Sequence, residues 1–364
     1  MVGGVFAGAL GGCRPSEPGP AVIRIGAVAS LTGPAGEQGK NWVEGAELAV
    51  AELRARGTAV ELIVENDETS APKVAAAFQK LARIDRVGAI IGGTWDYLAE
   101  TAYPLAERLR IPFVTPSNPV EVLSAEAQRN RWVFSNGLSL RATRRAVTDF
   151  FRAEGVRSLG LVYPALPFGT VQAAMVREVA RELGIPVTTE VEFVYDSGYL
   201  DSVRLAVLKV VEGAPDLVFG IFDASGVDLF LRELEKLRGR SRFLTTQHLD
   251  QAFLLAGEGG RARYAGAFGV YPRLDDNAFI ARYAAHFGRA PNVYAAEGYD
   301  ALMFLATALQ AGVDLAAPQA VFTYRGVTGE HRLPPNGRAL VEDRAVVMTT
   351  RRGVFEAYAP ERRD

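Results

Sequence analysis

The sequence predicts an α/β protein with two doubly wound lobes, each built on a parallel sheet. Short apolar runs of strand length alternate with stretches of helical periodicity, and the connections are only a few residues long. Such alternation is typical of parallel sheets that are covered by helices on both faces. The pattern starts again near residue 158. With 364 residues, the chain is too long for one ordinary hydrophobic core and long enough for two.

The first run of strands and helices begins with a buried strand at residue 22. The helix that follows has apolar side chains at helical spacing between Val43 and Leu53. The next helix has Pro72 near its first turn, where proline is tolerated. The expected strands are 22–28, 60–64, 87–91 and 111–114, and the expected helices are 41–56, 72–84 and 98–110.

The second run repeats this plan and is followed by a helical stretch and a terminal hairpin. Its expected strands are 158–163, 187–194, 217–222 and 243–246, and its expected helices are 169–183, 201–212 and 227–237. Helices are also expected at 277–287 and 295–310, a helix end or hinge at 320–325, and a hairpin from 345–350 to 354–358 around Arg352-Gly353. No low-complexity segment or short repeat interrupts the pattern.

The single cysteine, Cys13, lies in a distinctive context. A short apolar stretch ends at Leu10, two glycines follow, and the seven residues after Cys13 are too rich in proline for a helix. One cysteine cannot form an internal disulfide, and an incidental thiol is the alternative interpretation. Leu10-Gly11-Gly12-Cys13 resembles the lipobox of bacterial lipoproteins, although no charged residue precedes Leu10. The resemblance implies a signal peptide at 1–12, complete or truncated, a tether at 13–21 and a lipid on Cys13.

Composition and motifs argue against several classes of function. The formal net charge is −2, so no basic face for nucleic acid is expected. The segment from Gly33 to Asn41 follows a strand like a phosphate loop, but Pro34 and Asn41 replace the required glycine and hydroxyl residue. No G-x-G-x-x-G or G-x-S-x-G motif is present. His248, His286 and His331 lie far apart, without metal-ligand spacing. The chain is therefore expected to be no enzyme and to hold no metal or cofactor.

Ligands of open parallel sheets bind beyond the carboxyl ends of the strands, where the winding reverses. This rule selects the loops 30–40, 92–97, 115–119, 163–169, 223–226 and 246–250. Their aromatic and polar side chains are suited to a small-molecule cleft. The candidate binding residues are Trp95, Asp96, Tyr97, Ser117, Asn118, Phe168, Asp223, Gln247 and His248. For each residue taken alone, helix capping or packing is an equally good interpretation.

Several segments, in order, resemble one known family. They are Gly26 to Pro34, Glu44 to Ala49, Ile90 to Gly93, Ile111 to Ser117, Tyr294 to Leu302, Gly326 to Gly329 and Asn336-Gly337. Together they are similar to the leucine/isoleucine/valine-binding proteins, the branched-chain amino-acid type of periplasmic solute receptor. The similarity extends from about Val22 to Tyr358. It implies the type I periplasmic binding fold, in which three hinge crossovers join the lobes.

The resemblance also implies boundaries and roles. The crossovers are expected near 136–141, 246–250 and 324–329. The first lobe would comprise 22–137 and 250–325, and the second 138–249 and 326–364. In such receptors the first lobe holds the ligand carboxylate, which places Trp95, Asp96, Ser117 and Asn118 there. The second lobe supplies an aromatic lid and a carboxylate for the ammonium group, which places Phe168, Asp223 and Gln247 there.

Two departures from the family leave the ligand open. Trp95-Asp96 stands where amino-acid receptors often have serine or threonine, and the neutral Gln247 stands where they often have a carboxylate. A buried ammonium needs a carboxylate partner, and Asp96 would repel a ligand carboxylate. An aromatic acid, an amide, a modified amino acid and a polyamine-like cation all remain open.

The function that the resemblance implies is that of an extracytoplasmic receptor of an ABC importer. It would be anchored to the membrane by the lipid on Cys13, close on a small amino-acid-like or related ligand, and dock onto permease and ATPase subunits. A ligand sensor with the same fold is the alternative.

Overall fold

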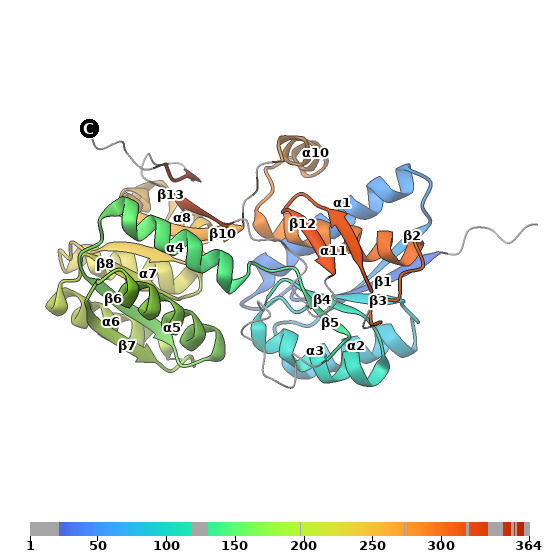
Figure 1. The fold of residues 1–364 in the computed structure, drawn as a ribbon, viewed down its shortest axis with the longest axis horizontal. Helices are drawn as coiled ribbons and strands as arrows, with labels where there is room; N and C mark the ends of the chain where they lie inside the picture. Colours follow the sequence, from blue (N-terminus) through green and yellow to red (C-terminus); the bar gives the residue numbers. More distant parts are fainter. Residues whose placement is uncertain are drawn as a thin grey trace, which may run out of the picture.

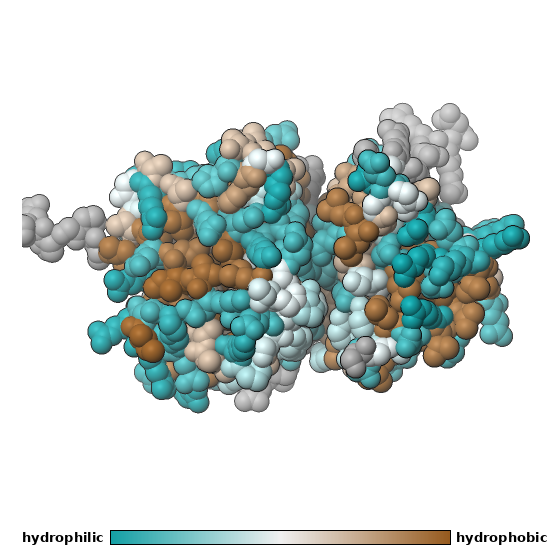
Figure 2. All heavy atoms as spheres, turned by 180° about the vertical axis from the view of Figure 1, so that it is seen from behind, coloured by the Kyte–Doolittle hydropathy of each residue, from teal (hydrophilic) through white to brown (hydrophobic). Residues whose placement is uncertain are grey.

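The computed structural model describes residues 22–117, 130–196, 198–272, 274, 276–317, 320–333, 345–350, 353 and 355–359. Two α/β lobes lie side by side, one coloured mostly blue, cyan and orange and the other green and yellow (Figure 1). Seen from the opposite side, their surfaces meet along a narrow waist (Figure 2). The expected class, two lobes with parallel sheets and covering helices, is confirmed.

The first lobe is built on a five-stranded parallel sheet with the order β2-β1-β3-β4-β5. Its strands are β1 (Ile23–Ala29), β2 (Val60–Asn66), β3 (Ala89–Gly92), β4 (Phe113–Thr115) and β5 (Val133–Ser135), and its helices include α1 (Gly36–Ala55), α2 (Ala71–Arg83) and α3 (Asp96–Leu109). The chain winds outward from β1 in both directions. The loops after β1 and β3 therefore flank the point where the winding reverses.

The second lobe has a seven-stranded sheet with the order β14-β13-β10-β9-β8-β6-β7. Its strands are β6 (Leu159–Pro164), β7 (Val187–Phe193), β8 (Leu217–Gly220), β9 (Arg242–Thr245), β10 (Ala267–Pro272), β13 (Ala345–Thr349) and β14 (Glu356–Ala357). Its helical segments are α4 (Leu140–Glu154), α5 (Pro167–Glu182), α6 (Tyr199–Gly213), α7 (Ala224–Lys236), α8 (Leu249–Leu255), α9 (Gly257–Gly260) and the 3-10 turn η3 (Arg261–Tyr264). The described strands of this sheet pair in parallel except at one side, where β13 runs antiparallel to β10 and the edge strand β14 runs antiparallel to β13.

After β10 the chain returns to the first lobe. There it forms α10 (Asn277–Phe287), α11 (Val293–Gln310) and a hairpin of β11 (Phe322–Arg325) and β12 (Glu330–Leu333). Asp300 on α11 fastens the hairpin, because its carboxyl group accepts hydrogen bonds from the backbone of Val327 at 2.9 Å and of Thr328 at 2.7 Å. His331 Nε2 lies 3.0 Å from the same carboxyl group.

The observed chain path differs from the predicted boundaries in two places. β10 joins β9 in the second sheet, whereas residues 250–325 were expected in the first lobe, so the second crossover follows β10 instead of lying at 246–250. Residues 322–333 form a hairpin that Asp300 holds to the first lobe, so the third crossover follows β12 instead of lying at 324–329. The helix end expected at 320–325 is therefore a strand. The first crossover leaves β5 for α4, as expected.

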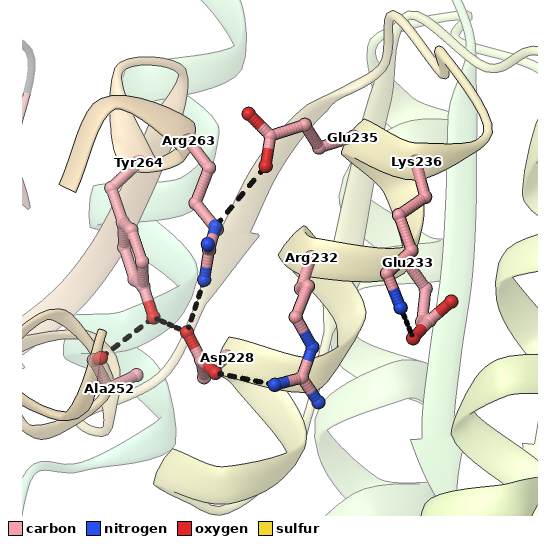
Figure 3. Close-up of polar contacts among 8 residues, drawn as sticks. All are labelled: Asp228, Arg232, Glu233, Glu235, Lys236, Ala252, Arg263 and Tyr264. Carbon is pink, nitrogen blue, oxygen red and sulfur yellow. Dashed lines mark hydrogen bonds and ion pairs between the residues drawn. The ribbon is translucent and has the colours of Figure 1, made fainter. Parts of the chain in front are cut away.

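A polar cluster on the second lobe shows how α7 is fixed to the segment that follows β9 (Figure 3). Asp228 Oδ1 lies 2.9 Å from the hydroxyl of Tyr264 and 3.2 Å from Arg263 Nη1. The same hydroxyl lies 2.7 Å from the carbonyl oxygen of Ala252, while Arg263 also pairs with Glu235. The cluster begins about one turn into α7 and connects this helix to α8 and η3, so it stabilises the second lobe.

The helices α1 and α11 are in backbone contact. A Cβ atom placed on Gly45 would lie 1.8 Å from the carbonyl oxygen of Ala295, and one placed on Gly298 would lie 1.9 Å from the carbonyl oxygen of Trp42. Real atoms do not approach so closely, so only glycine permits this contact. Each helix thus contributes one glycine to the contact, which holds the two helices in a fixed register.

Within the described ranges, no helix has the length and apolar character needed to cross a membrane. Cys13 and the predicted signal peptide and tether lie outside the described residues, so the lipid anchor stays a prediction.

The glycine contact predicts a large effect of a very small substitution. Gly298→Ala should destabilise the protein by about 3 kcal/mol or more, because one methyl group must push two backbones apart. Gly259→Ala is the control, since nothing lies within 4 Å of a Cβ atom at that helical position. It should change stability by no more than about 1 kcal/mol. Urea unfolding followed by circular dichroism measures both variants, and equal midpoints would contradict the assignment of a close contact.

Candidate functional site

A cavity of about 180 Å³ lies between the two lobes. Its walls come from loops at the carboxyl ends of β3, β4, β6, β8 and β9, together with side chains of α1, α4 and α11. The lining residues are Gln38, Thr94, Trp95, Asp96, Tyr97, Pro116, Ser117, Leu138, Leu140, Thr143, Pro164, Leu166, Phe168, Gln172, Tyr195, Ile221, Phe222, Asp223, Thr246, Gln247, His248, Val270, Tyr294 and Glu297. Aromatic walls with a few inward polar groups are typical of small-molecule sites.

The structure brings the predicted site residues together around this one cavity. Trp95, Asp96, Tyr97, Ser117, Phe168, Asp223, Gln247 and His248 all line it. Asn118 lies outside the described residues. Their contact with a ligand stays a prediction, whereas their convergence follows from the topology, because parallel strands direct their following loops to one edge.

The wall that follows β3 begins with a tight glycine turn. Gly93 has φ of +78°, and a Cβ atom there would lie 2.6 Å from Ala99, so the turn requires glycine. The turn directs Trp95 across the cavity to α1, where its indole N–H donates to Gln38 Oε1. The hydroxyl group of Ser117 donates to the carbonyl oxygen of Gly93. In this conformation the hydroxyl hydrogen of Ser117 is therefore already donated to a protein group.

Asp96 is the first residue of α3. Burial raises the pKa of its carboxyl group, while the backbone N–H groups of Tyr97 and of Asp96 itself lower it by a smaller amount. Carboxylates are favoured at a helix N-terminus because the unpaired N–H groups carry partial positive charge. A carboxyl group of the chain itself, that of Asp96, therefore lies at the first turn of α3.

Asp223 plays the corresponding part in the second lobe. It caps α7, accepting a hydrogen bond from the backbone of Gly226 at 2.8 Å. Its other contacts are the hydroxyl groups of Tyr195, at 2.8 Å, and of Tyr199. The two tyrosine rings stack with centroids 4.4 Å apart. Burial, followed by the neighbouring Asp223 carboxylate, raises the pKa of both phenols, so each remains a hydrogen-bond donor.

Gln38 on α1 joins the two lobes across the cavity. Because Trp95 donates to its carbonyl oxygen, its amide nitrogen must be the group that faces Tyr294 Oη, at 3.0 Å, and His248 Nδ1, at 3.1 Å. Tyr294 in turn donates to the carbonyl oxygen of Gln247 at 3.1 Å. Since Gln247 and His248 follow β9, these bonds link the first lobe directly to the second.

Burial lowers the pKa of His248, and the Asp223 carboxylate opposes this by a smaller amount. A neutral ring accepts the hydrogen bond from Gln38 at Nδ1 and carries its own hydrogen on Nε2. Protonation of Nδ1 would remove this acceptor, so a low pH should weaken the hydrogen bond between Gln38 and His248 that joins the lobes.

Glu297 lies on the part of α11 that reaches the cavity. Its side chain is 1% exposed, and its Oε1 has no hydrogen-bond partner among the described residues. Burial raises the pKa of this carboxyl group well above its usual range, and the Asp300 carboxylate adds to the effect. The lining also contains unpartnered Thr246 Oγ1 and Gln172 Oε1. Over the parts of the chain that the structure describes, no group of three or more His, Cys, Asp or Glu side chains is arranged to hold a metal.

The sequence analysis missed Gln38, Tyr294 and Glu297 as site residues. Gln38 lies in the selected loop 30–40 but was not named as a candidate, and the other two lie in the segment Tyr294 to Leu302, which was used only for the family resemblance. The usable signal was Glu297 itself, because a carboxyl group within an almost wholly apolar helix rarely lacks a purpose.

A family model described as periplasmic binding protein matches residues 22–346. The chain belongs to this family. The resemblance to the leucine/isoleucine/valine-binding type is thereby confirmed. As a periplasmic binding protein it places its cavity where the two lobes face each other. The comparison with curated protein sequences gives no match.

Solved structures agree with the fold of this periplasmic binding protein. The substrate-binding protein LivJ from Streptococcus pneumoniae, in complex with isoleucine, is 17% identical with a TM-score of 0.79, over 93% of this chain and 100% of that chain. The leucine-binding protein LivK from Thermotoga maritima is 19% identical with a TM-score of 0.78, over 93% and 98%. A solute-binding protein from Rhodopseudomonas palustris, in complex with benzoate, is 17% identical with a TM-score of 0.77, over 94% and 98%. At these identities the similarity establishes the fold alone.

The lowered pKa of His248 predicts a dependence of stability on pH. Its pKa is lower in the folded protein than the usual 6.5, so the unfolded chain binds more protons below that pH. The contribution is complete above about pH 6.5 and is lost as the pH falls towards the lowered value. His248→Gln should therefore lose less stability than the wild type between pH 7.5 and 5.5 in urea unfolding. The exposed His286, changed to Gln, is the control, and equal losses in all three proteins would contradict the lowered pKa of His248.

Proposed function

We propose that the protein is the solute-binding receptor of an ABC importer, which holds a small ligand in the cavity between its lobes. The observation that carries this proposal is the composition of the cavity, to which both lobes contribute aromatic and polar side chains. A ligand placed there touches both lobes at once. Family membership supports the same conclusion.

Ligand binding is coupled to closure of the lobes about the crossovers. Contacts to both walls exist only when the lobes are close, so the ligand shifts the equilibrium by its differential affinity for the closed form. The bonds from Gln38 and Tyr294 to the segment 247–248 join the two lobes, and we expect them to stabilise the closed arrangement. The closed form would then dock onto permease subunits, whose ATPases drive import.

The proposed ligand is a small amino-acid-like or related polar or aromatic molecule. Solved relatives of this fold were crystallised with isoleucine, leucine, benzoate and 3,4-dihydroxybenzoic acid. The aromatic wall formed by Trp95, Phe168 and Phe222 suits an apolar body of this size. A lipid on Cys13 would hold the receptor at the membrane, outside the cytoplasm.

A ligand sensor is the second candidate, because the same closure can signal to a partner instead of delivering a solute. Sensor and receptor share the cleft, and they differ in whether closure increases affinity for a permease. Binding of the liganded protein to permease subunits in membranes would favour the receptor, and unchanged transport in a strain that lacks this protein would favour the sensor.

The experiment that tests the proposal is a thermal-shift screen of residues 22–364 against amino acids, amides, aromatic acids and polyamines. A ligand that binds only the folded state raises the melting temperature by mass action. A hit should also reduce the radius of gyration in small-angle X-ray scattering, because the lobes close. A ligand bound with no closure would contradict the proposed mechanism, and a protein that binds no member of the panel would contradict the proposed function.

Asp223 should contribute to affinity for the ligand found in this way. Asp223→Asn keeps the cap of α7 but removes the negative charge, and it should weaken binding at least tenfold, or about 1.4 kcal/mol. Asp276→Asn is the matched control, since Asp276 caps α10 in the same manner, by accepting from Phe279, and lies outside the cavity. Titration calorimetry measures both, and equal affinities would remove Asp223 from the site.

A further inference from the structure

Glu297 is a buried group whose hydrogen-bonding capacity the protein leaves unused. It lines the cavity, it is 1% exposed, and its Oε1 has no partner among the described residues. A carboxyl group buried in this way costs free energy unless something binds it. The cavity is the place from which a partner can reach it.

The charges of the cavity are unbalanced. Asp96 on α3, Asp223 ahead of α7 and Glu297 on α11 supply three carboxyl groups from three elements. No lysine or arginine side chain is among the lining residues that the structure describes. A cation that enters the cavity therefore meets three attracting groups and no repelling one.

At two of the helices that reach the cavity, a carboxyl group of the chain itself lies at the N-terminus. The N-terminus of α3 is occupied by the carboxyl group of Asp96, and that of α7 by the carboxyl group of Asp223. These first turns would otherwise offer free N–H groups to an anion. Other helices also bring their first turn to the lining: α4 and α11 are capped by Ser139 and Asn292, whereas α1 and α5 have no side-chain cap, and Pro167 removes one N–H group from the start of α5.

The aromatic residues of the lining favour the same kind of ligand. Trp95, Phe168, Tyr195 and Tyr294 come from both lobes. Their ring faces attract a positive charge, and this attraction strengthens when water is excluded. The cavity thus combines the two kinds of group that stabilise an organic cation.

We infer that Glu297, together with Asp96 and Asp223, forms a site for a ligand that carries a protonated amine and no carboxylate. The inference rests on the proposed function and adds to it the charge of the ligand and the residue that recognises it. Glu297 lies on the first lobe, close to the contact between α1 and α11, so it binds the amine from the wall opposite Asp223.

Binding of the amine is coupled to loss of a proton from Glu297. In the free protein burial favours the neutral carboxyl group. When the ammonium group arrives, the O–H bond of Glu297 breaks, its proton leaves to the solvent, and an ammonium N–H donates to the carboxylate that remains. The affinity therefore increases as the pH rises, until the pH exceeds the pKa of Glu297 in the free protein.

Other titratable groups surround Glu297, and none of them replaces it. Those on its own helix are Tyr294 and Asp300, and those across the cavity are Asp96, Asp223 and His248. Asp300 already binds the hairpin through Val327 and Thr328. The elements that pack on α11 are α1, β1, β3, β11 and, through the ring of Phe279, α10. None of them places a lysine or arginine in the described lining.

Two sets of matched compounds test the charge of the ligand. One set is 2-phenylethylamine, 2-phenylethanol, 3-phenylpropionate and L-phenylalanine, and the other is hexylamine, hexanol, hexanoate and L-norleucine. In titration calorimetry with residues 22–364, we expect at least one amine to bind ten times more tightly than its alcohol, carboxylate and amino acid. We also expect net release of protons when the amine binds at pH 6.5, measured by comparing phosphate with a buffer of larger ionisation enthalpy.

The variant Glu297→Gln tests the residue. It should weaken amine binding at least tenfold, abolish the released proton, and leave binding of the alcohol unchanged. Glu100→Gln, on the exposed side of α3, is the control and should behave as the wild type. Equal melting temperatures of the two variants without ligand would show that Glu297→Gln folds normally, and Glu297→Asp provides a second variant that can still ionise.

The outcomes separate the inference from the proposed function. A carboxylate, an amino acid or an alcohol that binds as tightly as its amine overturns the inference and leaves the receptor function standing. So does an unaltered amine affinity or an unaltered proton release in Glu297→Gln. Binding of a compound without an amine group in the wider screen also overturns the inference and leaves the receptor function standing. If no compound of any set binds, both the inference and the proposed function fail.

Discussion

The backbone contact between α1 and α11 is the constraint on which the rest of the cleft depends. Gly45 and Gly298 bring the two helices together without intervening side chains, so neither helix can slide or rotate past the other. This contact sets the distance between Gln38 at the start of α1 and Tyr294 at the start of α11. Gly45 and Gly298 do not line the cavity, but their contact determines whether the polar groups of the first lobe reach the second lobe.

The second lobe meets this fixed wall with groups that depend on its own sheet. Asp223 and His248 follow adjacent strands, β8 and β9, so the parallel pairing of these strands holds them side by side. Asp223 is further fixed by Gly226 and the two tyrosine hydroxyls. Each lobe thus holds its half of the cavity through its own contacts, which is what the proposed closure by movement of rigid bodies about the crossovers requires.

The sequence predicted the two lobes and the cleft loops because both follow from alternation and from the direction of parallel strands. The sequence-based prediction was wrong where long-range contacts determine the lobe to which a segment belongs. The run 267–272 is as apolar as any predicted strand, but only its pairing with β9 places it in the second lobe. The turn 326–329 was interpreted as a crossover, whereas hydrogen bonds from a distant residue, Asp300, make it a hairpin of the first lobe. Glu297 was missed because apolar periodicity does not show which side of a buried helix meets a cavity.

The chain's own carboxyl groups support the proposal that this cleft binds a cation rather than an anion. In a doubly wound fold the helices begin where the ligand binds, so their N-termini favour negative charge by default. Here Asp96 and Asp223 occupy two of those positions themselves. The positive ends of the helices are thereby neutralised, and negative charge is turned towards the cavity. In the proposed site, side chains at the starts of two helices would therefore set the charge preference of the cleft without changing the architecture of the fold.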